Sequence, residues 1–350
     1  MNDLKLIKPK KLNAGDTVAA ISLSWGGASV FPHRYQAGKK QLEESFGLKV
    51  IETPHALAPA GDLADQPQLR ASDLHWAFEN PDVKAVIAII GGDDSVRLID
   101  HVDVEILRKH PKIFMGYSDS TVTHFQCLKA GLTSIYGPSI MAGFAENGGL
   151  FEYMKASVRQ TLFSTAPLGD VTANMNGWTD AFLDWANPDN QPIKRPLKQS
   201  CGYRFLQGER AVTGHLIGGC VEVLEMIKGT TLWPDKRQWD GAILFLETSE
   251  EAPSQSYVVR CLRSYAATGI LEKLSGIILG RPANLKPEQI QQYDEAIEHV
   301  VAKECGLSHM PIITQMDFGH TDPMGCLPYG AQARIDPVAK KFELLDSAVS

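Results

Sequence analysis

The sequence lacks several patterns that assign a chain to a cofactor or metal class. Its cysteines contain no C-x-x-C pair, which argues against a disulfide framework and against a zinc site. Neither a Walker pattern nor a Gly-x-Gly-x-x-Gly fingerprint supports nucleotide-cofactor chemistry. His124 and Cys127 share one face of a predicted helix, which alone is weak evidence for a metal. We therefore expect no metal and no cofactor. The cysteines, expected to be mostly reduced and buried, are Cys127, Cys201, Cys220, Cys261, Cys305 and Cys326.

Long apolar runs and an excess of basic residues are also missing. No stretch approaches the roughly 20 apolar residues that cross a bilayer. Residues 1–10 carry positive charge, but no apolar segment or small-residue cleavage site follows them, so we expect no signal peptide. The net charge is -7 with acids and bases interspersed, which leaves no basic stripe for nucleic acid, although a local basic pocket for a phosphate is compatible with it. The sequence predicts a cytoplasmic protein that binds neither membranes nor nucleic acid.

The length and the apolar content of the sequence predict two hydrophobic cores. Its 350 residues, 44% of them hydrophobic, exceed the size at which a single core stops growing. In the first part, short apolar runs alternate with helix-like segments, which predicts an α/β domain with a parallel sheet flanked by helices. In such a domain, ligands bind at the carboxyl ends of the strands. The predicted strands are 17–22, 50–53, 85–90 and 113–115, and the predicted helices are 34–46, 69–79 and the segment after Ser118.

Three regions are predicted along the chain. Residues 1–165 form the N-terminal α/β domain, which ends in a helix over 150–163. Residues 166–202 are rich in Pro, Asn, Asp and Gly and weakly periodic, which is typical of a linker or of a long functional loop. The pattern of short apolar runs in residues 203–350 predicts a smaller mixed sheet or barrel. Its predicted strands are 211–217, 242–246, 276–279, 312–317, 332–335 and 341–345, with helices near Val221, Ser256 and Gln289.

Ser118 follows a short apolar run and opens a helix-like segment. A serine at a tight strand-to-helix turn is held out of the sheet beside free backbone N–H groups, which is the geometry that acyl transfer needs. The segment Gly116-Tyr117-Ser118-Asp119 lacks the second glycine of the usual elbow. The alternative is that Ser118 or Asp119 caps the helix. By itself the motif favours the cap.

Two residues further along the chain are candidate partners for this serine. Glu247 closes a buried strand, where catalytic side chains often project, although it is also compatible with a solvated acid near a helix start. His320 lies in a Gly- and Pro-rich loop after a predicted strand, a common place for a general base, and the alternative is a solvated turn histidine. With ten histidines in the chain, neither residue is decisive alone.

Five motifs occur in order along the chain: Gly91-Gly92-Asp93-Asp94-Ser95, Gly116-Tyr117-Ser118-Asp119, Gly218-Gly219-Cys220, Leu246-Glu247 and Asp317-Phe318-Gly319-His320-Thr321-Asp322-Pro323. In this order they resemble the LD-carboxypeptidase family of serine peptidases, and the resemblance runs from Pro9 to about Asp336. Within that family, the segments 219–222 and 228–235 resemble the microcin C immunity branch. The resemblance implies a triad with Ser118 as nucleophile, His320 as general base and Glu247 as the carboxylate that orients it.

The resemblance also assigns roles to the turn after the third predicted strand. It implies an oxyanion hole made by the backbone N–H of Asp119 and a second N–H from the turn Gly91-Gly92-Asp93, for which we take Asp93. From the residues alone, this Gly-Gly turn is equally compatible with a phosphate cradle or with a plain tight turn.

Further residues are predicted to contact substrate. An aromatic side chain of the loop 166–202 is expected to stack on a nucleobase, as the resemblance implies. The alternative is that these rings pack locally at the domain junction. The candidates are Trp178, Phe182 and Trp185, with Trp185 leading, together with Gly91 and Gly92 of the turn and with Glu222 and Arg281, two residues that are equally compatible with structural ion pairs.

The sequence is compatible with three functions. The first is a serine peptidase that cleaves an amide near the C-terminus of a small peptide or peptidyl-adenylate, as in microcin C immunity. The second is release of D-alanine from murein tetrapeptide. The third is a non-catalytic ligand-binding module. The resemblance favours a homodimer.

Overall fold

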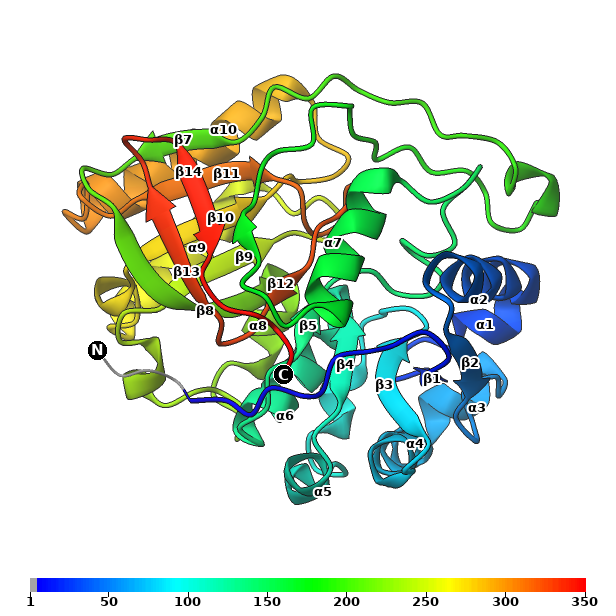
Figure 1. Ribbon diagram of the computed structural model, residues 1–350. Helices are drawn as coiled ribbons and strands as arrows, with labels where there is room; N and C mark the ends of the chain where they lie inside the picture. The colour runs from blue at the N-terminus through cyan, green and yellow to red at the C-terminus, as the bar shows by residue number, and fades with distance from the viewer. Residues whose placement is uncertain (1–4) are drawn as a thin grey trace.

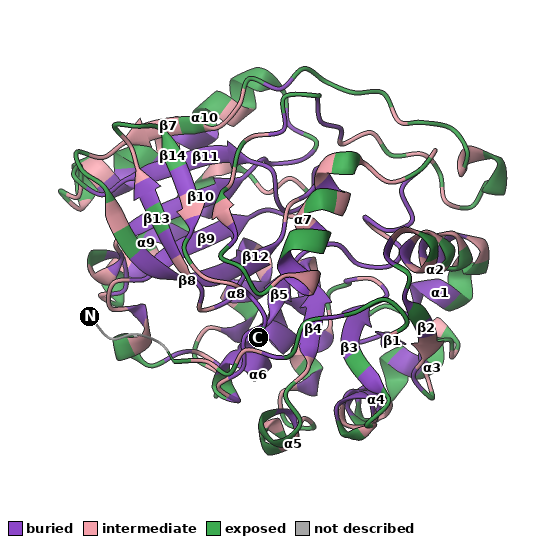
Figure 2. Ribbon diagram, viewed as in Figure 1, coloured by how far each residue is buried: buried purple, intermediate pink, exposed green. Residues whose placement is uncertain are grey.

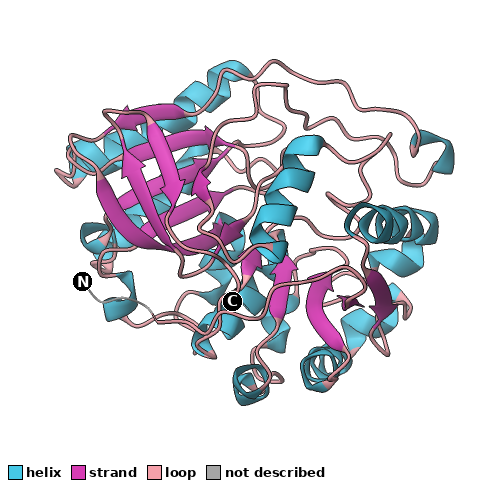
Figure 3. Ribbon diagram, viewed as in Figure 1, coloured by secondary structure: helices cyan, strands magenta, loops and turns pink. Residues whose placement is uncertain are grey.

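Two β-sheets lie side by side in the computed structural model, which describes residues 5–350 (Figure 1). Residues 1–4, the start of the segment on which the signal-peptide prediction rests, lie outside the described residues. Helices pack around both sheets (Figure 3). No helix within residues 5–350 combines the length and the apolar composition that crossing a membrane requires.

The first sheet has six strands, and both of its faces are buried. Val18 and Ala20 of β1 belong to one apolar cluster, whereas Ala19 and Ile21 belong to another on the opposite face. Burial on both faces is typical of parallel sheets covered by helices. Figure 2 shows most of the central strands as buried, whereas the edge strand over 49–52 is largely intermediate or exposed. In spatial order the strands are β12 (Leu327–Pro328), β5 (Ile135–Tyr136), β4 (Ile113–Gly116), β3 (Val83–Ala88), β1 (Thr17–Ile21) and β2 (Lys49–Glu52).

The second sheet has eight strands and is mixed. Its centre, from β8 to β11, is parallel, whereas β7 at one end and β13, β14 and β6 at the other pair antiparallel. The predicted fold class is confirmed. The spatial order is β6 (Gly169–Asp170), β14 (Lys341–Leu344), β13 (Gln332–Asp336), β8 (Val212–Cys220), β9 (Ile243–Glu247), β10 (Gly276–Gly280), β11 (Ile312–Met316) and β7 (Arg204–Gln207).

The helices that the sequence patterns predicted lie close to the predicted positions, whereas the short helices over 27–30, 60–65 and 104–109 were not predicted. Several helices start with proline, whose fixed φ suits the first turn. The α-helices are α1 (Gly27–Val30), α2 (Pro32–Phe46), α3 (Ala60–Asp65), α4 (Pro67–Glu79), α5 (Val104–Lys109), α6 (Thr121–Lys129), α7 (Glu152–Phe163), α8 (Val221–Ile227), α9 (Gln255–Ala267) and α10 (Pro287–Glu298). The other helical segments are η1 (Ser95–Leu98), η2 (Ser118–Ser120), η3 (Pro188–Asn190), η4 (Lys236–Trp239), η5 (Leu271–Lys273) and η6 (His299–Glu304).

The end of the chain returns to the first sheet, which the sequence patterns did not predict. β12 pairs antiparallel with β5, and Val349 packs in one of the first sheet's two cores. The backbone of Ser350 exchanges hydrogen bonds with Pro9 and Lys11. The segment that carries His320 is therefore followed directly by a strand of the sheet that carries Ser118, which draws the two halves of the chain together.

Candidate active site

Ser118 lies at the carboxyl end of β4, where it begins the short helix η2. Its φ is +60°, in the left-handed region that a residue other than glycine rarely adopts. Such strain is typical of the sharp strand-to-helix turn that presents a nucleophilic serine. The Ser118 N–H donates to the phenol oxygen of Tyr136 at 3.0 Å, and its carbonyl accepts a hydrogen bond from the Thr121 hydroxyl at 2.7 Å. The side-chain oxygen of Ser118 makes a different contact, described next.

Three side chains from distant parts of the sequence meet at this turn. His320 Nε2 lies 3.1 Å from Ser118 Oγ, and His320 Nδ1 lies 2.6 Å from Glu247 Oε2. Glu247 ends β9 and is fully buried, and the His320 side chain is 7% exposed. The structure thus brings together the three residues that the family resemblance singled out, in the order hydroxyl, imidazole, carboxylate.

Tyr136 connects both ends of this arrangement, and no motif in the sequence marked it. It ends β5, the strand beside β4, and its ring is buried. Its O–H donates to Glu247 Oε1, while its oxygen accepts the Ser118 N–H. Burial and the Glu247 charge raise the pKa of Tyr136, so the phenol stays protonated and keeps donating. Tyr136 therefore fixes the Glu247 carboxylate relative to the Ser118 backbone.

The protonation of His320 is set by the acids around it. Burial opposes protonation, but Glu247, followed by Glu250 and Glu222, outweighs it and raises the pKa of His320 to about 9. Glu250 Oε2 also lies 3.2 Å from His320 Nε2. The acids around His320 therefore favour its protonated form.

The Gly-Gly turn after β3 lies against the serine. A Cβ added to Gly91 would lie 3.2 Å from Ser118 Oγ and 3.4 Å from the amide nitrogen of Asp119. Asp119 ties the two turns together, because its carboxylate accepts the Ser95 N–H at 2.9 Å and its carbonyl accepts from the Ser95 hydroxyl at 2.8 Å. The φ of Gly92 is +146°, and a Cβ there would lie 2.2 Å from Ser24 Oγ, so a side chain does not fit. Space beside Ser118 thus depends on Gly91, whereas Gly92 allows the turn to approach Ser24 closely.

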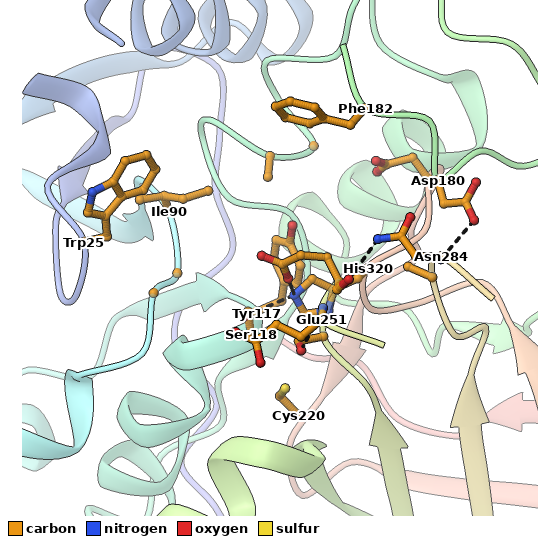
Figure 4. Close-up of a pocket in the computed structure, with 18 of the residues that line it drawn as sticks. Trp25, Ile90, Tyr117, Ser118, Asp180, Phe182, Cys220, Glu251, Asn284 and His320 are labelled. Carbon is orange, nitrogen blue, oxygen red and sulfur yellow. Dashed lines mark hydrogen bonds and ion pairs between the residues drawn. The ribbon is translucent and has the colours of Figure 1, made fainter. Parts of the chain in front are cut away.

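Ser118 and His320 open into a cavity of about 960 Å³, a size that suits a small peptide or a nucleotide. Figure 4 shows Trp25 and Phe182 on one side of the serine and histidine and Cys220 on the other. The cavity is also lined by Asp93, by Trp185 and by the acids Glu222, Glu250 and Glu251. It therefore has an aromatic end and an acidic wall.

The aromatic end is built on Arg34, which no motif in the sequence marked. The guanidinium of Arg34 lies 4.8 Å from the ring centre of Trp185, and the Phe31 and Phe182 rings lie 6.1 and 5.8 Å from it. Arg34 also donates to Asn147 at 2.7 Å. Burial lowers the pKa of Arg34 to about 10, which still leaves it charged at neutral pH. Only a fold that packs α2 against the loop 166–202 creates this cluster.

A second arginine joins the loop 166–202 to the segment of His320. Arg195 donates to Glu146 Oε1 at 2.9 Å and to Asp322 Oδ2 at 2.7 Å. Thr179 and Asp322 exchange backbone hydrogen bonds of 2.7 and 2.9 Å. The loop that presents Phe182 and Trp185 is therefore fastened two residues away from His320.

Replacing Arg195 with alanine is expected to destabilise the fold by about 3 to 5 kcal/mol, because two carboxylates, one of them almost fully buried, lose their shared cation. Burial raises the pKa of the Glu146 carboxyl, and the charge of Arg195 opposes this rise. The loss of stability caused by Arg195→Ala should therefore be smaller at acidic pH. Denaturant unfolding measures the effect. Arg263→Ala, which removes an exposed arginine paired with Glu304, is the matched control and should cost much less. Equal losses in the two variants would contradict the interpretation.

Trp178 does not contact the cavity, which corrects the prediction that it binds substrate. Its side chain is buried, and its indole N–H donates to the carbonyl of Gln199 at 3.2 Å. Lys198 and Arg281 lie 4.6 and 4.9 Å from its ring centre. Trp178 therefore packs at the base of the loop, the alternative that the composition left open.

The other candidate positions divide between the cavity and the core. Glu222 lines the cavity, but its carboxylate already accepts the N–H and the hydroxyl of Ser249 at 3.0 and 2.6 Å. Arg281 forms a buried ion pair with Asp317 at 2.8 Å, which is a structural role. The His124 ring contacts the Ser134 hydroxyl and the carbonyl of Gly116, and burial lowers its pKa to about 3. His124 is thus a neutral core residue.

Comparisons with known proteins cover nearly the whole chain. Residues 18–137 match the LD-carboxypeptidase N-terminal domain, and residues 213–335 match the LD-carboxypeptidase C-terminal domain. A putative carboxypeptidase of Vibrio cholerae is 30% identical over 97% of this chain and 98% of its own length. The microcin C7 self-immunity protein MccF of Escherichia coli is 26% identical over 97% of this chain and 96% of its own length. A probable murein peptide carboxypeptidase of Bacillus subtilis is 28% identical over 98% of this chain and 95% of its own length.

Solved structures agree with this assignment. An MccF-like protein from Streptococcus pneumoniae in complex with AMP has a TM-score of 0.83 and 28% identity, over 94% of this chain and 98% of its own. MccF in complex with aspartyl sulfamoyl adenosine has a TM-score of 0.82 and 26% identity, over 98% of this chain and 100% of its own. The chain belongs to the LD-carboxypeptidase family and is a serine-type carboxypeptidase of the kind that includes the microcin C immunity proteins.

Proposed function

We propose that this protein hydrolyses the amide bond next to the C-terminal group of a small peptide or peptidyl-nucleotide, with Ser118, His320 and Glu247 as its catalytic triad. The observation that carries the proposal is the chain of contacts from Ser118 Oγ through His320 to Glu247 on the wall of one cavity. A hydroxyl paired with an imidazole that is oriented by a carboxylate is the arrangement that activates a serine.

The mechanism follows from these contacts. Neutral His320 takes the proton of Ser118 as its oxygen attacks the carbonyl carbon, and it later returns a proton to the leaving nitrogen. Glu247 keeps the proton of the neutral ring on Nδ1 and stabilises the imidazolium that forms. Water then hydrolyses the acyl-serine by the same steps. The backbone N–H groups of Asp119 and Asp93 would bind the oxyanion, and the position of Gly91 beside the Asp119 nitrogen supports this assignment.

The aromatic end of the cavity is consistent with a nucleotide as the leaving group of the reaction. Trp185, backed by Arg34, offers a planar ring for a nucleobase, while the guanidinium supplies positive charge for an anionic linkage. MccF has been solved with aspartyl sulfamoyl adenosine, and the pneumococcal MccF-like protein with AMP. We further propose that the protein acts in the cytoplasm as a homodimer, on the strength of the family relationship.

Purified protein is expected to hydrolyse aspartyl sulfamoyl adenosine faster than it releases D-alanine from murein tetrapeptide, because the tetrapeptide has no aromatic base to stack on Trp185. Product release measured by chromatography and mass spectrometry gives kcat/KM for each substrate. Trp185→Ala should raise KM for the nucleotide substrate alone, and Trp178→Ala is the control from outside the cavity. The reverse ranking would favour the alternative function in murein recycling, which the Bacillus subtilis relative supports.

A further inference from the structure

The turn after β3 holds its proposed oxyanion donor outside regular secondary structure. Asp93 lies between the end of β3 and the start of η1, and it is exposed. Trp25 donates its backbone N–H to the Gly91 carbonyl at 3.2 Å, which attaches the beginning of the turn to the segment after β1. The position of the Asp93 N–H therefore depends on what holds the residues on either side of it.

Asp94, the next residue along the turn, is held by a buried arginine. Arg70 Nη1 donates to Asp94 Oδ1 at 2.6 Å, and Arg70 Nη2 donates to Asp94 Oδ2 at 3.1 Å. The Ser24 hydroxyl also donates to Asp94 Oδ1, at 3.1 Å. Two hydrogen bonds from one planar guanidinium fix both the position and the orientation of a carboxylate. The turn thus has a rigid attachment directly after Asp93.

Arg70 belongs to α4 and is itself held in place. Its side chain is fully buried, and its Nη1 also donates to the Leu23 carbonyl at 3.0 Å. Burial opposes ionisation of Asp94, but the hydrogen bonds and the charge of Arg70 outweigh it and hold the pKa of the Asp94 carboxyl below its usual value. The pair therefore stays charged at neutral pH and joins α4 and the segment after β1 to the turn after β3.

The chemistry of this pair indicates a role in positioning. Arg70 Nε is buried and has no hydrogen-bond partner within residues 5–350. A buried ion pair often gives no more stability than apolar side chains of similar volume. Apolar side chains would fill the same space, but they would not fix the direction of the backbone at Asp94.

Arg97 allows a comparison, because it contacts the same carboxylate from the solvent side. Its Nη1 lies 3.2 Å from Asp94 Oδ2, and its side chain is 46% exposed. Ion pairs with so much solvent access contribute little, whereas Arg70 is fully buried and makes two hydrogen bonds to the carboxylate. Of the two arginines, Arg70 is therefore the one that fixes Asp94.

We propose that Arg70 is a positioning residue that holds the Asp93 N–H in the oxyanion hole through Asp94. The inference rests on the proposed function, in which the N–H groups of Asp93 and Asp119 bind the oxyanion. Asp93 lines the cavity, whereas Arg70 and Asp94 do not. Because the hole stabilises charge that develops only in the transition state, Arg70 affects the rate of the chemical step and not the binding of the substrate.

The first test compares kcat and KM with aspartyl sulfamoyl adenosine. Arg70→Lys keeps the positive charge but replaces the planar fork with a single ammonium group, so the turn should lose its alignment. We expect kcat to fall about 10- to 100-fold, the scale for a misplaced catalytic group, while KM changes less than about twofold. Arg97→Ala is the matched control and should change kcat by less than about threefold. Equal losses in the two variants, or a loss carried by KM alone, would overturn the proposal.

The second test uses a fluorophosphonate probe to separate positioning from folding. The Ser118 oxygen attacks phosphorus as its proton passes to His320, fluoride leaves, and the phosphoryl oxygen takes the place of the oxyanion. The final extent of labelling counts folded molecules, whereas the rate constant reports the oxyanion hole in each of them. Arg70→Lys should lower the rate constant about tenfold or more. A lower final extent with an unchanged rate constant would show a merely structural role and overturn the proposal.

Asp94→Asn keeps the tests decisive if Arg70→Lys does not fold. The Asp94 side chain is 26% exposed and asparagine has nearly the same volume, so the fold should be retained. This variant should show the same loss of kcat and of labelling rate, and wild-type rates in it would refute the inference. Wild-type protein that neither reacts with the probe nor hydrolyses aspartyl sulfamoyl adenosine would refute the proposed function instead.

Discussion

Replacement of Ser118 with alanine is expected to lower kcat by about 10⁶-fold, which is the scale of loss when a serine nucleophile is removed from a working triad. The reason is that no other hydroxyl of the described site lies within hydrogen-bonding distance of His320 Nε2. Initial rates with aspartyl sulfamoyl adenosine measure the loss. The double variant Ser118→Ala/His320→Ala should be no slower than either single variant, because the two residues act as one unit.

Covalent labelling separates an enzyme from a binding module that merely retains this geometry. A fluorophosphonate probe should add to Ser118 of the wild-type protein and fail to add to Ser118→Ala. Ser254→Ala, at an exposed serine before α9 whose side chain makes no capping hydrogen bond, is the control for nonspecific labelling. Wild-type protein that neither reacts with the probe nor turns over either substrate would favour the non-catalytic alternative.

Replacement of Glu247 with glutamine is expected to lower kcat by about 10⁴-fold, because an amide no longer holds the proton of the neutral imidazole on Nδ1. Glu247 accepts two hydrogen bonds, from His320 Nδ1 and from Tyr136. An amide presents an N–H to one of these partners, which favours the tautomer that has its proton on Nε2, facing Ser118. That tautomer donates to the serine instead of accepting from it.

The pH dependence of the Glu247→Gln variant gives an independent check. The Glu247 charge favours the protonated form of His320, so its removal should lower the pKa of His320 from about 9. The residual kcat/KM should therefore level off at lower pH than in the wild-type protein. Tyr136→Phe keeps the carboxylate but removes one donor to it, and should cost about 10- to 100-fold, as expected for one lost hydrogen bond to a charged group. A Tyr136→Phe loss as large as that of Glu247→Gln would show that orientation alone, without charge, accounts for the effect.

The parts of the arrangement that the residues themselves indicated are those with local causes. Ser118 follows a run of buried residues over 113–117 and opens a helical turn, and Gly91 follows another apolar strand. Because the carboxyl ends of neighbouring parallel strands meet at one edge of a sheet, these two turns line the same cavity. The family motifs added Glu247 and His320, which no local pattern distinguished from a solvated acid or a turn histidine.

The chain of residues alone therefore determined the α/β class, most of the strands and helices, and the edge of the sheet at which the site lies, since apolar periodicity and turn residues act over a few positions. Only the tertiary structure decided that Tyr136 supports Glu247, that Arg195 fastens the loop 166–202, that Glu250 contacts His320, and that Trp178 packs away from the cavity. These contacts mostly join residues far apart in the sequence, and they depend on strand order and side-chain packing. No periodicity encodes such features, because they arise only when separately formed elements exclude water from a common interface.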